Sequence, residues 1–281
     1  MQADFGLFKA CVMFRQIIAV VARAVYVILL AICIGFFMRT CLCDRFVVRG
    51  ESMTPSFEDG EPVYVNKLVF GGRIYKDFDF SKSSVSSFRL PGLRDLRVGD
   101  AVMLNYPFAR SNDTINFRIN YVYLKRCLGC PGDTVRIIDG FYIHPQTGEQ
   151  ILCNNHCKRL HETPDSALVD QGVVVDAFQI NKKMNWTIRD FGPLFVPSKG
   201  SEVVLTPMNY KTYKKQIYYE TGLKLTRDGE NIKLGDKVID SYLFTSNWYF
   251  FGGDNVLNSK DSRYFGLVPE EYIIGVVFGF R

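Results

Sequence analysis

The chain has 281 residues, of which 47% are hydrophobic and 14% aromatic, enough for one large domain or two small ones and too apolar for a disordered protein. The net charge at pH 7 is only +5, and like charges do not gather in long runs, so nothing in the composition indicates nucleic-acid binding.

The first predicted element is an apolar segment, residues 17–38. As a helix, its 22 residues would extend about 33 Å, enough to cross the hydrocarbon core of a bilayer. Its one charge, Arg23, lies near the start, where the side chain can reach the interface. Lys9 and Arg15 precede it, as in a cleaved signal peptide, but no small-x-small cleavage site follows in residues 39–43. We therefore expect a retained membrane anchor, whose orientation the flanking charges do not decide.

After the anchor, short segments with alternating apolar side chains predict β-strands. In one of them, Val122 and Leu124 face one side and Lys125 the other. Asp139-Gly140 separates two further segments and is a strong signal for a two-residue hairpin. The predicted strands of this half are residues 46–48, 62–67, 101–106, 121–126, 134–138 and 141–144, and residues 71–97 are expected to form a long loop.

The second half of the chain gives weaker signals. Residues 153–199 are polar with little periodicity, an Asp-Gly turn lies within residues 223–234, and residues 272–280 resemble a closing strand. The aromatic residues 248–251 predict either a buried strand or a contact with a lipid surface. We find no amphipathic pattern longer than three helical turns after the anchor, so the sequence predicts a mainly β protein with hairpins in its middle segment.

The eight cysteines do not indicate a single role. Four of them lie in or beside the anchor. Cys127 and Cys130 form a CxxC pair, and Cys153 and Cys157 a CxxxC pair. The two pairs fit disulfides, four ligands of one zinc ion, or packed free thiols, and the sequence leaves these alternatives open.

Ser52, shortly after the anchor, is a candidate nucleophile that would need a base beside it. The three histidines all lie in the predicted hairpin and the polar middle segment, in no recognisable catalytic setting. A lysine can be the base when desolvation lowers its pKa, and Lys125 lies on a strand among apolar neighbours. The alternative for Lys125 is an ordinary solvated lysine.

Several segments together resemble the sequence boxes of type I signal peptidases, in the order that the family has them. They lie behind an N-terminal anchor, as in the family. The matching segments are residues 50–57 (GESMTPSF), 98–102 (VGDAV) with Tyr106-Pro107, 123–126 (YLKR) with Gly129 and 131–133 (PGD), and 253–255 (GDN) with 258–266 (NSKDSRYFG).

The resemblance implies a role for each matching residue. Ser52 aligns with the family's nucleophile, and Lys125 with its general base. Ser259 aligns with a serine whose hydroxyl orients the lysine amine. The remaining supporting residues are an ion pair that braces the site, Asp261 and Arg263, and two residues that pack near the lysine, Gly253 and Asp254.

The resemblance is incomplete around the oxyanion site. The backbone N–H of Ser52 is expected to supply one donor to the tetrahedral intermediate. Some relatives add a side-chain hydroxyl two residues earlier, but Gly50 has none, so the second donor is unassigned. Arg49 and Glu51 also replace residues that many relatives have as proline and glycine, which puts the shape of the cleft in doubt.

The resemblance also implies how substrate would bind. An extended peptide would pair with the strand before Ser52 and with the strand that carries Lys125. Small side chains of a signal peptide would enter shallow apolar pockets. The candidates for lining these pockets are Val48, Met53, Phe57, Tyr123 and Leu124, of which Met53 and Phe57 fit a buried core equally well.

Taken as a whole, the resemblance implies a serine endopeptidase that removes signal peptides from translocated preproteins, without metal or cofactor. It implies a transmembrane helix and tail (1–43), a β-rich catalytic domain (44–138 and 235–281) and an inserted second β domain as a variable cap (139–234). The expected location is the bacterial inner membrane, single-pass, with the catalytic domain on the extracytoplasmic side near the secretion translocon. Competing hypotheses are a Ser-Lys protease for one dedicated pilin or transfer protein, and a non-enzymatic β module with a cysteine zinc or redox site.

Overall fold

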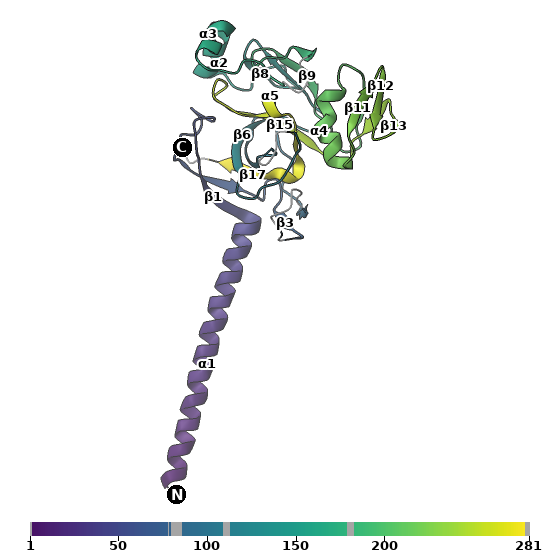
Figure 1. Cartoon of the computed structure of the whole chain (residues 1–281). Helices are drawn as coiled ribbons and strands as arrows, with labels where there is room; N and C mark the ends of the chain where they lie inside the picture. The colour runs from purple at the N-terminus through teal and green to yellow at the C-terminus, as the bar shows by residue number, and fades with distance from the viewer. Residues whose placement is uncertain (1, 78, 80–85, 109–112, 179–182, 279–281) are drawn as a thin grey trace.

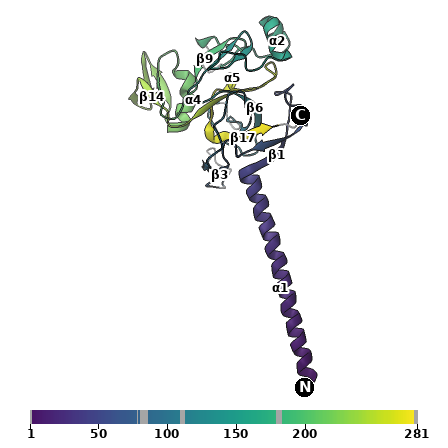
Figure 2. The same cartoon turned by 180° about the vertical axis from the view of Figure 1, so that it is seen from behind.

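A computed structural model describes residues 2–77, 79, 86–108, 113–178 and 183–278, and consists of one long helix followed by a β-rich part (Figure 1). The helix α1 (Gln2–Phe37) continues into one π-helical turn, η1 (Met38–Leu42). Within it, Met13–Leu42 is long and apolar enough to cross a membrane, with a mean hydropathy of 2.8 and no burial of its most apolar window. The predicted apolar helix is therefore present, and it projects away from the rest of the chain in both views (Figure 2).

Within the described ranges, the main sheet has seven strands, and every adjacent pair is antiparallel. The last strand in the sequence is not at its edge. It lies between the second and fifth strands and completes the middle of the sheet. In spatial order the strands are β1 (Cys43–Val47), β2 (Pro62–Asn66), β17 (Ile273–Phe278), β5 (Ala101–Asn105), β6 (Val122–Gly129), β15 (Trp248–Gly252) and β16 (Val268–Pro269).

Apolar side chains cover both faces of this sheet. All five residues of β5 are buried, and the four apolar ones alternate between two clusters. Val102 and Leu104 belong to the larger cluster, whereas Ala101 and Met103 belong to a smaller one. A strand that is buried on both faces is apolar on both, which is why β5 shows no polar alternation before Asn105 at its end.

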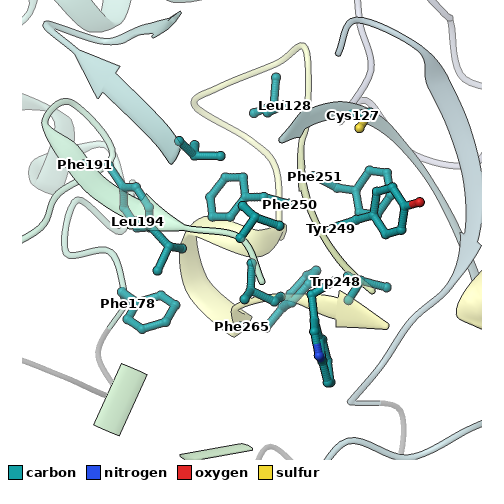
Figure 3. Packing of buried hydrophobic residues seen from close by; sticks show 14 of the residues in the cluster. Cys127, Leu128, Phe178, Phe191, Leu194, Trp248, Tyr249, Phe250, Phe251 and Phe265 are labelled. Carbon is teal, nitrogen blue, oxygen red and sulfur yellow. The ribbon is translucent and has the colours of Figure 1, made fainter. Parts of the chain in front are cut away.

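The aromatic residues 248–251 form β15 and are buried in the larger cluster (Figure 3). Phe250 packs against Phe191, with ring centroids 5.3 Å apart, and Tyr249 stacks near Phe251. None of these side chains is more than 3% exposed. The buried-strand alternative is therefore the right one, and lipid contact by this segment is excluded.

The hairpin predicted at Asp139-Gly140 is confirmed. β7 (Thr134–Ile138) and β8 (Phe141–Ile143) pair antiparallel on either side of it. Asp139 and Gly140 both have positive φ, 55° and 86°, as the tight turns that suit paired strands require. A third strand, β9 (Phe191–Phe195), completes this small sheet beside β7.

The middle of the chain is more helical than predicted. Among the described residues after the anchor, the longest helix is α4, whose 12 residues make slightly more than three turns. Its buried side chains are Thr212, Tyr213, Gln216 and Ile217, and because two of them are polar, hydropathy does not reveal the buried face. The helices and short strands of this region are α2 (Asn155–Glu162), α3 (Asp165–Asp170), α4 (Tyr210–Thr221), β10 (Glu202–Val204), β11 (Leu225–Asp228), β12 (Asn231–Leu234), β13 (Lys237–Val238) and β14 (Ser241–Leu243).

The segment expected to be a long loop, residues 71–97, contains a short hairpin of β3 (Arg73–Tyr75) and β4 (Ser87–Arg89). Two arginines, the buried Arg73 and the half-buried Arg89, tie it to the main sheet. Arg89 donates to the carbonyl of Ile273 at 2.7 Å, and Arg73 donates to Asn105 at 2.8 Å. Two short helices, α5 (Ser262–Phe265) and η3 (Glu270–Tyr272), lie between β15 and β17, and the predicted strand end at residues 279–280 lies outside the described residues.

Candidate active site

Ser52 lies in the turn between β1 and β2, and the final part of the chain holds that turn in place. Within the turn, Phe57 donates its backbone N–H to the carbonyl of Met53 at 3.0 Å. Asn255 donates its backbone N–H to the carbonyl of Ser52 at 3.1 Å, and its side-chain amide donates to the carbonyl of Glu51 at 3.2 Å. The position of Ser52 therefore depends on residues two hundred positions later.

Lys125 lies in the middle of β6, paired with Val102 of β5. Its amine is 2.6 Å from Ser52 Oγ and donates to it. The side chain is 3% exposed, and desolvation lowers the pKa of Lys125 to about 8, partly opposed by the negative charge of Asp261. Once the amine loses its proton, its lone pair can accept the Ser52 hydroxyl proton across the same contact. The two residues that the sequence singled out are thus in direct contact.

Gly253 lies where there is no room for a side chain. A Cβ added there would lie 2.2 Å from Ser259 Oγ and 2.5 Å from the carbonyl oxygen of Ser52. Ser259 is buried and close to Ser52, but among the described residues its hydroxyl has no hydrogen bond of good geometry, and none to Lys125. It does lie near enough to Asp261 to help lower the pKa of that carboxyl. That Ser259 orients the lysine stays a prediction.

Asp261 and Arg263 form a fully buried, bidentate ion pair. Arg263 Nε donates to Asp261 Oδ1 at 2.9 Å and Nη2 to Oδ2 at 2.8 Å, and neither side chain is exposed. Burial alone would raise the pKa of Asp261, but the guanidinium beside it holds that pKa below its ordinary value. Asp261 also accepts the backbone N–H of Gly253 at 2.9 Å. The pair therefore connects α5 to the glycine that packs against Ser52.

Asp254 is paired with the residue after Lys125. Arg126 donates to both carboxylate oxygens of Asp254, from Nε to Oδ1 at 2.6 Å and from Nη2 to Oδ2. Arg126 Nη2 also reaches Ser56 Oγ at 3.2 Å, in the turn that contains Ser52. This pair ties β6, the nucleophile turn and the final segment together. Sequence reasoning noted Asp254 but did not identify its partner.

Two further contacts were missed because they come from the segment without motifs. Tyr142 of β8 donates its hydroxyl to the carbonyl of Gly253 at 2.9 Å, and this contact is buried. Asn154, the N-cap of α2, donates to the carbonyl of Asp254 at 2.7 Å. Only the N-cap pattern before α2 could have pointed to Asn154, and nothing in the sequence pointed to Tyr142.

The backbone at Gly50 adopts a left-handed conformation, with φ of 82°, which favours glycine. Its N–H donates to Asp59 Oδ1 at 2.7 Å, so it is not available to an oxyanion in this arrangement. The N–H of Ser52 makes no hydrogen bond within the described part of the chain. The Ser52 N–H thus remains the candidate donor to the oxyanion. Gly50 instead stabilises the turn through its hydrogen bond to Asp59.

The candidate pocket residues are mostly inside the smaller core cluster. Val48, Met53, Phe57 and Leu124 are each at most 7% exposed and pack in that cluster. Tyr123 is only partly buried and stacks on Tyr106, with ring centroids 4.6 Å apart. Their role in binding substrate stays a prediction.

One edge of β6 is open beside Lys125. β5 pairs with residues 122–126 of β6 along one side. On the other side, β15 pairs with β6 only from Arg126 to Gly129. Within the described ranges, residues 122–125 therefore present unpaired backbone groups next to Ser52. An extended peptide could add to the sheet there.

The cysteines and histidines take no part in this site. Cys127 and Cys130 are free thiols with their sulfurs 3.7 Å apart, and Cys153 and Cys157 are also free. Among the residues that the structure describes, no group of three or more His, Cys, Asp or Glu could hold a metal ion. Of the histidines, His161 of α2 contacts Asp139, which lies in the turn between β7 and β8, at 3.0 Å.

Comparison with known proteins agrees with the geometry. Residues 21–280 match the family described as signal peptidase, peptidase S26. The chain is 27% identical to signal peptidase I of Buchnera aphidicola subsp. Baizongia pistaciae over 267 residues, covering 87% of this chain and 71% of that protein. It is 25% identical to signal peptidase I of Aquifex aeolicus over 253 residues, covering 90% and 80%. A shorter match, 32% over 99 residues, is to signal peptidase I of Pseudomonas aeruginosa. Since the family match covers almost the whole sequence, this chain belongs to the S26 family of signal peptidases.

Proposed function

We propose that this protein is a membrane-anchored serine endopeptidase that removes N-terminal signal peptides from preproteins. The observation that carries the proposal is the 2.6 Å contact between Ser52 and the desolvated Lys125. A serine needs a base beside it, and a lysine with a lowered pKa can be that base. The relatives named signal peptidase I supply the class of substrate.

In the proposed reaction, Lys125 takes the hydroxyl proton of Ser52 as its oxygen attacks the scissile carbonyl. The backbone N–H of Ser52 stabilises the oxyanion of the tetrahedral intermediate. The protonated Lys125 then gives its proton to the departing amine, and an ester on Ser52 remains. Lys125 next deprotonates a water molecule, which hydrolyses the ester and restores the serine.

The supporting residues act by position. Asp261 and Arg263 hold the final segment, and Gly253 allows it to pack against the nucleophile turn. Ser259 would orient the Lys125 amine if its side chain turned toward it. The signal peptide would add to the open edge of residues 122–125, with its small side chains facing the apolar cluster that contains Val48 and Met53.

The wider setting follows from the anchor. α1 would span the bacterial inner membrane once, with the β-rich part on the extracytoplasmic side, close to the translocon that delivers preproteins. Lipid would then surround the exposed apolar side chains of α1. We further propose residues 44–138 and 235–281 as the catalytic domain, and residues 139–234 as a cap inserted into it.

Cleavage of a preprotein should fall steeply as the pH drops below about 8, because protonation removes the lone pair of Lys125. The direction of this change follows from the role of Lys125. Its neutral amine is the active form, and the population of that form decreases as the pH falls below the pKa of Lys125. We expect kcat/KM to decrease about tenfold per pH unit well below that value. The measurement is a pH–rate profile of the full-length protein in neutral-detergent micelles.

Circular dichroism at each pH separates this loss from acid unfolding. A profile that stays flat down to pH 5, with the protein folded, would rule out Lys125 as the base. Absence of cleavage at every pH, including pH 9, would count against a peptidase that acts alone on preproteins.

Gly253→Ala should lower kcat/KM by about 100-fold or more, because displacements of about 1 Å at a reacting group cost that much. The added Cβ would collide with Ser259 and with the carbonyl of Ser52, so the nucleophile turn must shift. Gly35→Ala is the matched control, since a Cβ there meets no atom within 4 Å. Equal activity of the two variants would show that the turn tolerates displacement.

A further inference from the structure

A cleft of about 990 Å³ lies beside the Ser52–Lys125 site and takes no part in the chemistry described so far. Its walls come from the segment after β5, from residues 172–174, from α4 and residues 224–225 after it, and from the final segment before and within α5. The floor is apolar and includes Phe108, Leu257 and Phe265. A cleft of this size accommodates several residues of an extended peptide.

The cleft is adjacent to the reacting groups. Ser259 is part of its wall and packs against the same Gly253 as the carbonyl of Ser52. On the other wall, Tyr106 stacks on Tyr123, whose ring centroid is 5.3 Å from the amine of Lys125. A peptide that leaves the site past Ser259 therefore enters the cleft directly.

Two buried hydroxyls on these walls lack a good hydrogen-bond partner within the described residues, Tyr106 OH and Ser259 Oγ. Leaving a buried polar group unsatisfied is costly, and such groups commonly await a ligand or water. The backbone of a bound peptide could satisfy the Tyr106 hydroxyl, while the Ser259 hydroxyl also lies close to Asp261. The walls are thus polar where a peptide backbone would pass.

The rim of the cleft is basic. Lys214, Lys224 and Lys260 are exposed there and form no ion pair with any residue that the structure describes, and Lys215 lies among them. One acidic residue, Asp113, stands on the same rim. Four lysines against one aspartate give an excess of positive charge, which favours a ligand with negative charge.

From these features we propose that the cleft binds the first residues of the mature chain, after the cleaved bond, and prefers acidic side chains among them. The inference rests on the proposed function and adds a specificity determinant to it. Anionic lipid headgroups would meet the same charges, but α4 and α5 lie on the side of the β-rich part away from α1 in both views (Figures 1 and 2). A peptide leaving the site is therefore the occupant that the position favours.

The test compares three peptide substrates that are identical up to the cleaved bond and carry Asp and Glu, Ser and Gly, or Lys at the second to fifth positions after it. The full-length protein in neutral-detergent micelles should show kcat/KM about tenfold higher for the acidic than for the basic substrate, since several partly screened charges act together. This ratio should shrink at 0.5 M NaCl. The variant Lys214→Glu, Lys224→Glu, Lys260→Glu should reverse the preference.

The matched control is Lys158→Glu, Lys199→Glu, Lys237→Glu, which changes the net charge equally at exposed lysines outside the cleft. It should keep the wild-type preference.

Three results would overturn the proposal: no preference in the wild type, a preference that survives in the cleft variant, or an equal loss in the control. If added phosphatidylglycerol alters turnover of the wild type but not of the cleft variant, and substrate preference is equal in both, the cleft takes lipid instead. Cleavage of the neutral substrate tests the proposed function separately.

Discussion

Replacing Lys125 by Met should reduce preprotein cleavage by about 10⁴-fold or more, the loss seen when a member of a nucleophile–base unit is removed. Methionine has a similar length and is apolar, so it fills the site without supplying a lone pair to Ser52. Ser52→Ala should cost as much, and the double variant should be no worse, because the two residues act as one unit. Single-turnover cleavage of a preprotein by the full-length protein measures all three variants.

The fold should survive this change. Lys125 is 3% exposed, and its burial already disfavours the charged amine, so an apolar side chain of similar length removes a desolvation cost. Lys237→Met, at an exposed position of β13, is the control and should keep full activity. A folded Lys125→Met protein with near-normal cleavage would refute the Ser-Lys mechanism and revive the histidines as candidate bases.

Arg263→Met should lower the free energy of unfolding by about 3–5 kcal/mol at pH 7, the cost of leaving one member of a buried ion pair without its partner. Asp261 would then be an unpaired, fully buried carboxylate. Denaturant unfolding, with the midpoint and slope both recorded, measures the loss.

The loss should depend on pH in a defined direction. The pKa of Asp261 is lowered in the native protein, so its contribution to stability is present above the unfolded pKa of about 3.9 and decreases as the pH falls through the native pKa. The difference between wild type and Arg263→Met should therefore become smaller in acid. Arg227→Met, at the exposed pair with Glu230, is the control and should cost less than about 1 kcal/mol. Equal losses at the two pairs would mean that the buried pair does not brace the fold.

The sequence was most informative where local pattern decides structure. The hairpin at Asp139-Gly140 and the strand that carries Lys125 follow from short-range rules, and the structure has both. The contact between Ser52 and Lys125 could be anticipated only through resemblance to a family, because no local pattern relates residues so far apart in the chain.

Long-range packing explains what the sequence did not reveal. α4 buries Thr212 and Gln216, so its inner face does not read as apolar. Tyr142 and Asn154 contact the final segment through backbone carbonyls, and such contacts require no particular partner side chain. From their chemistry alone, Met53 and Phe57 fit a pocket or a core equally well. The structure buries both in the smaller cluster, and whether they also line a pocket stays a prediction.

The central position of β17 has a consequence for when the enzyme can act. The turn with Ser52 leads into β2, Lys125 lies on β6 next to β5, and β17 occupies the space between these two halves of the sheet. Until β17 has been made and has paired, no described strand joins these two halves. A nascent chain would therefore carry its nucleophile and its base on separate, unjoined parts. Proteolytic competence would arise only once β17 has paired with both β2 and β5.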